Sequence, residues 1–160
     1  MRLEDIIGNK VPPDAFKLFS VFARYEYALK RSGFRARRDP FADWEAFAKE
    51  LPVEFFGRAT AIPSARILIE APPEKLKTNA SGGVEWRSDV APAYDSWTLI
   101  QAVKRVRNNL FHGDKHYDRD RDLKLTLASL DVLNCAYEIV AGTEGNERFS
   151  NFIIEFSMDY

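Results

Sequence analysis

The sequence predicts a mainly helical bundle of four or five helices with a small β-hairpin or loop insertion. Apolar residues recur three and four positions apart over several long stretches, which is the period of an amphipathic helix. Prolines precede these stretches and glycines follow them, as at helix starts and ends. The chain has 160 residues, of which 46% are hydrophobic. This is enough for a single domain over residues 1–160 with a core of its own.

Composition limits the classes of function. The formal net charge of −1 excludes a protein that binds nucleic acid through a uniformly basic surface. A local basic patch remains compatible with this charge. Cys135 is the one cysteine, so no internal disulfide can form. We expect its thiol to be unreactive and to lie within a helix. The N-terminal residues carry early acids and no apolar signal segment, and the most apolar stretch, residues 125–142, is too polar to span a bilayer. We therefore expect a cytoplasmic protein without membrane contact.

The first half of the chain is expected to be helical. A helix begins after Pro12 and ends at Gly33. Its apolar arc is Ala15, Phe19, Phe22, Ala23 and Leu29. Further helices are expected over residues 41–51 and 53–60, and Ser64 is placed to cap a brief helix that ends before Pro72.

The second half combines turn residues with two long helical patterns. The sequence Ser-Gly-Gly at 81–83 predicts a turn, so residues 75–89 form a small hairpin or an ordered loop. A long helix is expected over residues 94–112, where Gly113 ends it, and a last helix over residues 123–142. The aromatic tail, residues 145–160, is compatible with a strand, a short helix or a segment that docks on a partner.

The end of the long helix, "RNNLFHG", concentrates residues able to act on a phosphodiester. Asn108 and His112 lie four residues apart and share a helix face. Arg107 lies about 140° round the helix from His112, so two copies of the helix meeting at a two-fold axis would bring the groups together. Arg pairs with phosphate oxygens, and His at a helix end can exchange a proton near neutrality. The alternative is a surface ion pair at Arg107 and a capping role for His112.

The same heptapeptide resembles the Arg-x4-6-His signature of the HEPN superfamily. The resemblance implies an all-α bundle and a metal-independent ribonuclease site at a homodimer interface, with Arg107, Asn108 and His112 as catalytic residues. The order of landmarks across residues 15–140 resembles a plasmid- and phage-defence-associated HEPN branch. That setting implies a toxin or antiphage role, with an antitoxin or other regulatory protein as a further partner. In HEPN toxins that are silenced by AMP transfer, a Tyr follows the motif His by two residues. Here that position is Asp114, so we do not carry this regulation over.

A second element of the resemblance lies in the first helix. Glu26 falls within the apolar arc, and an acid there is costly unless it is paired. Lys30, Arg31 and Arg107 are the candidate partners. The stretch "EYALKR" also resembles the Glu-x3-Lys-Arg element of several HEPN ribonuclease families, which implies supporting roles for Glu26, Lys30 and Arg31. A plain salt bridge between Glu26 and Lys30 on a helix edge remains the alternative.

A local excess of positive charge follows this element. Tyr and Phe side chains alternate with cations over residues 24–38, a pattern that suits an RNA backbone. The predicted RNA-binding patch consists of Arg24, Arg35, Arg37 and Arg38. A solvated helix end would account for the same charges.

We expect neither a metal nor a cofactor. His112 and His116 have metal-ligand spacing, but Gly113 breaks the helix between them and no second ligand pair is evident. The expected function is therefore metal-independent cleavage of RNA by a homodimer. The alternative from another class is a non-catalytic HEPN module that binds RNA, a nucleotide or a partner protein.

Overall fold

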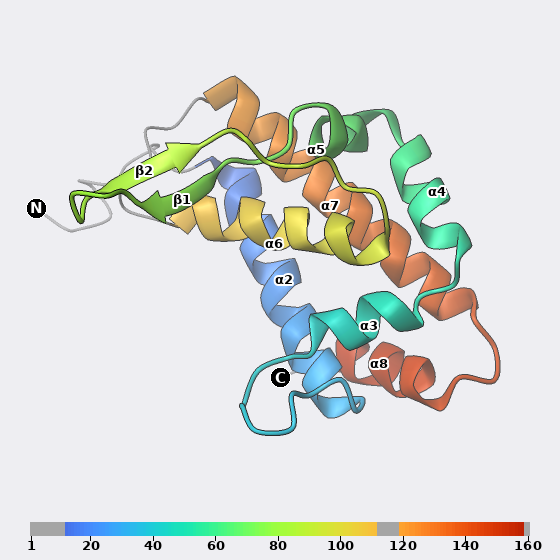
Figure 1. Cartoon of the computed structure of the whole chain (residues 1–160). Coiled ribbons are helices and arrows are strands. Elements are labelled where there is room, and N and C mark those ends of the chain that lie inside the picture. The colour runs from blue at the N-terminus through green and yellow to red at the C-terminus, as the bar shows by residue number, and fades with distance from the viewer. Residues whose placement is uncertain (1–11, 112–118, 159–160) are drawn as a thin grey trace, which may run out of the picture.

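The computed structural model describes residues 12–111 and 119–158 of the chain. These residues form seven α-helices, one 3-10 helix and a two-stranded antiparallel sheet (Figure 1). In chain order the elements are α2 (Pro13–Arg31), α3 (Trp44–Glu50), α4 (Glu54–Ala61), η2 (Pro63–Arg66), α5 (Ile67–Glu70), β1 (Lys75–Thr78), β2 (Val84–Arg87), α6 (Ser96–Phe111), α7 (Arg119–Gly142) and α8 (Glu147–Ser157). The predicted mainly helical fold with a small β-hairpin is confirmed.

Helix α2 has the predicted limits but buries a different stripe. Pro13 begins it, since its missing N–H would be unpaired there in any case. Gly33 follows its end with a φ of 91°, which a side chain would strain. The buried residues are Ala15, Leu18, Phe22, Tyr25, Ala28 and Leu29. Phe19 and Ala23, which the predicted arc included, are exposed, because the neighbouring helices cover the side of α2 that carries Leu18 and Tyr25.

The predicted helices of residues 41–71 are present, with altered ends. Helix α3 begins only at Trp44, because the Asp43 carboxylate accepts a hydrogen bond from the Ala46 N–H and caps it. Ser64 does not cap the brief helix that was predicted there. It lies inside η2 and donates instead to the Asp131 carboxylate of α7.

The β-hairpin has the predicted turn and is anchored from α6. The Asn79 carboxamide oxygen accepts hydrogen bonds from the N–H groups of Ser81 and Gly83, and Gly82 has a φ of 82°. At the base of the hairpin, the buried Asn109 amide donates to the Glu74 carbonyl at 2.8 Å. The hairpin therefore projects beside the C-terminal end of α6 (Figure 1).

Helix α6 begins with a reciprocal cap. The Asp95 carboxylate accepts the Thr98 N–H at 2.7 Å, and the Thr98 hydroxyl accepts the Asp95 N–H at 3.0 Å. Hydrogen bonds from the Thr98 hydroxyl and then its N–H lower the pKa of Asp95. This cap fixes the start of α6 two residues after the predicted position, and Phe111 is the last residue of α6. The predicted end at His112 and Gly113 lies outside the described residues.

Helix α7 is the central helix of the bundle. It contacts α2, α4, α6 and α8. By length and composition alone, Asp120–Gly142 could cross a membrane. However, its buried residues belong to the same core as those of the surrounding helices, and buried core helices pass the same test.

The aromatic tail is a helix that packs against the domain. Asn146 caps α8 by accepting the Phe149 N–H, and Phe149 and Phe152 are buried. Phe152 contacts the rings of Tyr25 and Phe47 at centroid distances of 5.1 and 5.6 Å. Residues 147–157 are therefore part of the core, and of the three structures compatible with the tail, the helix is the one observed.

Candidate functional site

Arg107 lies in the last turns of α6 with its guanidinium against three aromatic rings. Its Cζ atom is 5.5 Å from the ring centroids of Phe19 and Phe22 and 5.9 Å from that of Phe111. The side chain is half-buried, and its Nε atom is buried without a hydrogen-bond partner among the described residues. Ring faces attract a cation without neutralising it. The three rings thus hold the guanidinium in place without neutralising its positive charge.

No ion pair of Arg107 is found within residues 12–111 and 119–158. The surface ion pair proposed as the alternative role for Arg107 is therefore absent from this part of the chain. Among the described residues, the Arg107 Nη1 atom donates a hydrogen bond to the Oδ1 atom of its neighbour Asn108 at 3.1 Å.

The two adjacent asparagines of α6 have different surroundings. Asn108 is exposed beside Arg107, as a residue that contacts a ligand should be. Asn109 is buried and holds the base of the hairpin. The structure thus brings Arg107 and Asn108 together on the surface and assigns Asn109 a structural role. His112, the third predicted catalytic residue, lies outside the described residues.

Glu26 has a different partner from those expected. Its carboxylate is half-buried and accepts a long hydrogen bond of 3.4 Å from the Trp44 Nε1–H. Lys30 is exposed, and Arg31 lies 3.7 Å from the Glu155 carboxylate instead. No described ion pair joins Glu26 to the three cations named for it from the sequence.

The cation whose charge Glu26 influences is Lys104 of α6. Burial lowers the pKa of Lys104. The carboxylate of Glu26, and to a smaller extent that of Asp43, partly offset this by raising the pKa. Lys104 lies one helical turn before Arg107 and on the same side of α6. Sequence analysis missed Lys104, because no local pattern distinguishes it from a solvated lysine.

The four arginines of the predicted RNA-binding patch do not lie on one surface. Arg24 forms hydrogen bonds with the C-terminal end of α8. Its Nε atom donates to the Phe156 carbonyl at 2.7 Å, and its Nη2 atom donates to the Glu155 carbonyl at 2.9 Å. It therefore caps a helix, which corrects the expectation of a surface contact. Arg35, Arg37 and Arg38 are exposed in the loop that follows α2.

That loop lies far from Arg107. Arg107 contacts α2 at Phe19 and Phe22, whereas the loop begins after residue 31. At a rise of 1.5 Å per residue, the nine residues from Phe22 to Arg31 span about 14 Å. The loop that carries the three arginines therefore begins about 14 Å along α2 from the Phe22 ring that contacts Arg107.

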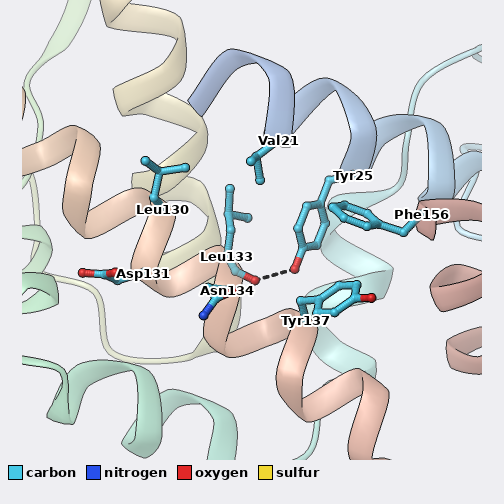
Figure 2. A pocket seen from close by; sticks show the side chains of 8 residues that line it. All are labelled: Val21, Tyr25, Leu130, Asp131, Leu133, Asn134, Tyr137 and Phe156. Atoms are coloured by element: carbon cyan, nitrogen blue, oxygen red, sulfur yellow. Dashed lines mark hydrogen bonds between the residues drawn. The ribbon is translucent and has the colours of Figure 1, made fainter. Parts of the chain in front are cut away.

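A cavity of about 510 Å³ lies between α2, α7 and α8 (Figure 2). Its walls are mainly apolar or aromatic, and the polar side chains of Tyr25, Asp131 and Asn134 have hydrogen-bond partners. The Tyr25 hydroxyl donates to the Leu133 carbonyl, and the Asn134 amide donates to Glu138 at 3.1 Å. Burial raises the pKa of Tyr25, so this phenol stays neutral. None of the predicted site residues lines the cavity, and we regard it as a gap in the packing between helices rather than a functional site.

Metal-ligating side chains do not gather in the described part of the chain. No group of three or more His, Cys, Asp or Glu residues there could hold a metal ion. Cys135 is buried and free, and burial raises the pKa of its thiol. A thiol with a raised pKa is a poor nucleophile, as expected for a structural residue.

Comparison with family models, with curated proteins and with solved structures finds no match to this chain.

Proposed function

We propose that this protein is a metal-independent endoribonuclease that cleaves RNA at a homodimer interface. The observation that carries the proposal is the Arg107 guanidinium, held by three rings without a carboxylate partner in the described chain. Asn108 is exposed beside it, and the sequence places His112 directly after the last residue of α6. The resemblance of "RNNLFHG" to the HEPN signature assigns the same three residues to RNA cleavage.

The proposed reaction needs only these side chains and the RNA. His112 removes the proton from a 2′-hydroxyl, whose oxygen attacks the adjacent phosphorus. The bond from phosphorus to the 5′-oxygen breaks, and the leaving oxygen takes up the proton that His112 has received, which returns the histidine to its starting form. Arg107 stabilises the negative charge on the phosphate oxygens, and Asn108 orients the phosphate. The products are a 2′,3′-cyclic phosphate and a 5′-hydroxyl end.

An apolar surface around Arg107 supports the dimer. Phe19 and Phe111 are 42% and 44% exposed, and their ring centroids lie 5.2 Å apart. Phe16, one turn earlier on α2, is 56% exposed. Large exposed apolar side chains that gather in one place mark an interface more often than isolated ones do.

We expect a homodimer in solution that depends on Phe16. The change Phe16→Glu should produce monomers at low micromolar concentration, because a charge would be buried at the interface. Val53→Glu is the matched control, since Val53 is 93% exposed at the start of α4. Light scattering measures the mass. A wild-type protein that is monomeric at high micromolar concentration would contradict the proposed interface.

The enzymatic test of the proposal is the replacement of Arg107. We expect Arg107→Ala to lower kcat/KM for RNA cleavage by about 10²–10³, the effect of removing one preorganised charge-stabilising group. Arg107→Lys should recover part of this loss, since it keeps the charge but not the planar fork. Arg58→Ala, an exposed arginine of α4, is the control. Unchanged cleavage by Arg107→Ala would refute the proposed role.

We further propose that the protein acts in the cytoplasm as a toxin or antiphage defence component, restrained by an antitoxin or another regulatory protein. The resemblance to the defence-associated HEPN branch supports this setting. A non-catalytic module that binds RNA, a nucleotide or a partner protein is the rival. RNA that is bound by the dimer and never cut would favour it.

A further inference from the structure

One face of α6 carries a row of aromatic and polar side chains. Trp97, Lys104, Arg107, Asn108 and Phe111 are spaced by seven, three, one and three residues, which keeps them on one side of a helix. At a rise of 1.5 Å per residue, the row is about 21 Å long. Helix α6 packs against α2 and α3 (Figure 1), so the row borders both of these helices.

Lys104 occupies the middle of this row. Its ammonium lies 5.6 Å from the centroid of the Trp97 ring, and the side chain is half-buried. No carboxylate within residues 12–111 and 119–158 is recorded within 4 Å of its Nζ atom. Lys104 has therefore lost part of its hydration without gaining a close partner. An external phosphate would supply that partner.

Trp97 forms a wall of a groove at the other end of the row. The groove has a volume of about 470 Å³ and is also lined by Tyr94, Phe56 and Ser96. Tyr94 is 74% exposed, and Trp97 and Phe56 are half-buried. Exposed aromatic faces stack on the bases of single strands whatever their sequence. Ser96 adds a hydroxyl that can donate to or accept from a base edge.

We propose that α6 carries a binding track for single-stranded RNA that extends from Arg107 to Trp97. Lys104 binds a backbone phosphate next to the one held by Arg107, and the groove at Trp97 holds a base. Two cations, Lys104 and Arg107, lie between the aromatic side chains of Trp97 and Phe111 along this face, so phosphates and bases of one strand would each meet a suitable group. This inference rests on the proposed RNA-cleaving role of the Arg107 end and adds the residues that bind the flanking nucleotides.

Fluorescence anisotropy with 2′-O-methyl RNA tests this track. Such RNA lacks the free 2′-hydroxyl and cannot be cut by the proposed reaction. For a ten-nucleotide strand, Lys104→Gln should weaken binding and reduce the slope of log K against log[salt] by about 0.7, the value for one phosphate contact on a single strand. Trp97→Leu should weaken binding about tenfold or more, through the loss of stacking. Trp97→Phe should retain most of the affinity.

Two controls make the result decisive. Lys124→Gln removes an exposed lysine of α7 that pairs with Asp120 at 2.8 Å, and it should leave binding and the salt slope unchanged. Thermal melting checks that each variant folds, and Trp97→Phe preserves an aromatic ring if Trp97→Leu does not fold. A three-nucleotide RNA is too short to span the row. Its affinity should therefore no longer respond to one of the two changes, at Lys104 or at Trp97.

The outcomes separate the track from the proposed function. If Lys104→Gln and Trp97→Leu both bind the ten-nucleotide RNA within twofold of wild type, the track is refuted, whether or not the protein cleaves RNA. If these variants weaken binding but the wild-type protein never cleaves unmodified RNA, the track stands and the proposed ribonuclease activity is refuted.

Discussion

Phe152→Ala is expected to lower the free energy of unfolding by about 3–5 kcal/mol, as large aromatic truncations in a core do. Phe152 is fully buried, and its ring lies 5.1 Å from Tyr25, 5.6 Å from Phe47 and 5.6 Å from Phe156 between centroids. These contacts join α8 to α2 and α3. The loss would leave a cavity that three separate elements surround. Denaturant unfolding monitored by circular dichroism measures the effect.

Ile154→Ala is the matched control on the same helix. Ile154 is 58% exposed, so its truncation should change the free energy of unfolding by about 0.5 kcal/mol or less. A loss below about 1 kcal/mol for Phe152→Ala would contradict the packing of α8 against the domain, because a terminal segment that is not packed contributes little to the core.

His112→Ala is expected to reduce RNA cleavage by about 10²–10⁴-fold, the usual contribution of one general acid–base group. The variant should fold and dimerise normally, since the interface proposed above consists of phenylalanines of α2 and α6. Single-turnover cleavage of a labelled single-stranded RNA measures the rate constant. His116→Ala, at the other histidine of the chain, is the control and should retain activity.

DNA of the same sequence should remain intact under all conditions. The proposed nucleophile is the 2′-hydroxyl of RNA, which DNA lacks. Cleavage of DNA, or an unchanged rate with His112→Ala, would mean that another nucleophile or base is at work.

The sequence predicts the helices well where local signals mark their ends. Pro13 and Gly33 bound α2 nearly as expected, and the Ser-Gly-Gly turn gives the hairpin. The prediction of the buried side of α2 is partly wrong, because apolar spacing within one helix does not show which side the neighbouring helices cover. Tyr25 takes a place in the core that Phe19 was expected to hold, since its hydroxyl finds a carbonyl partner on α7.

The roles of charged residues depend on partners that are distant in the sequence. Arg24 belongs to a basic run, yet it caps a helix 132 residues away. Lys104 shows no local signal, yet it lies near Glu26 and Asp43 because α6 packs against α2 and α3. Residue spacing within one element cannot reveal such contacts. The motif residues Arg107 and Asn108 could be found, since their relation is local to one helix.

The most direct test of the central claim is incubation of the purified protein with single-stranded RNA in excess EDTA, followed by analysis of the product ends. We expect cleavage that EDTA leaves unchanged, with 2′,3′-cyclic phosphate and 5′-hydroxyl ends. Those ends require attack by the RNA's own 2′-hydroxyl, and insensitivity to EDTA requires that no exchangeable metal ion generates the nucleophile. Cleavage that needs an added divalent metal, or products with 5′-phosphate ends, would contradict the mechanism built on Arg107, Asn108 and His112.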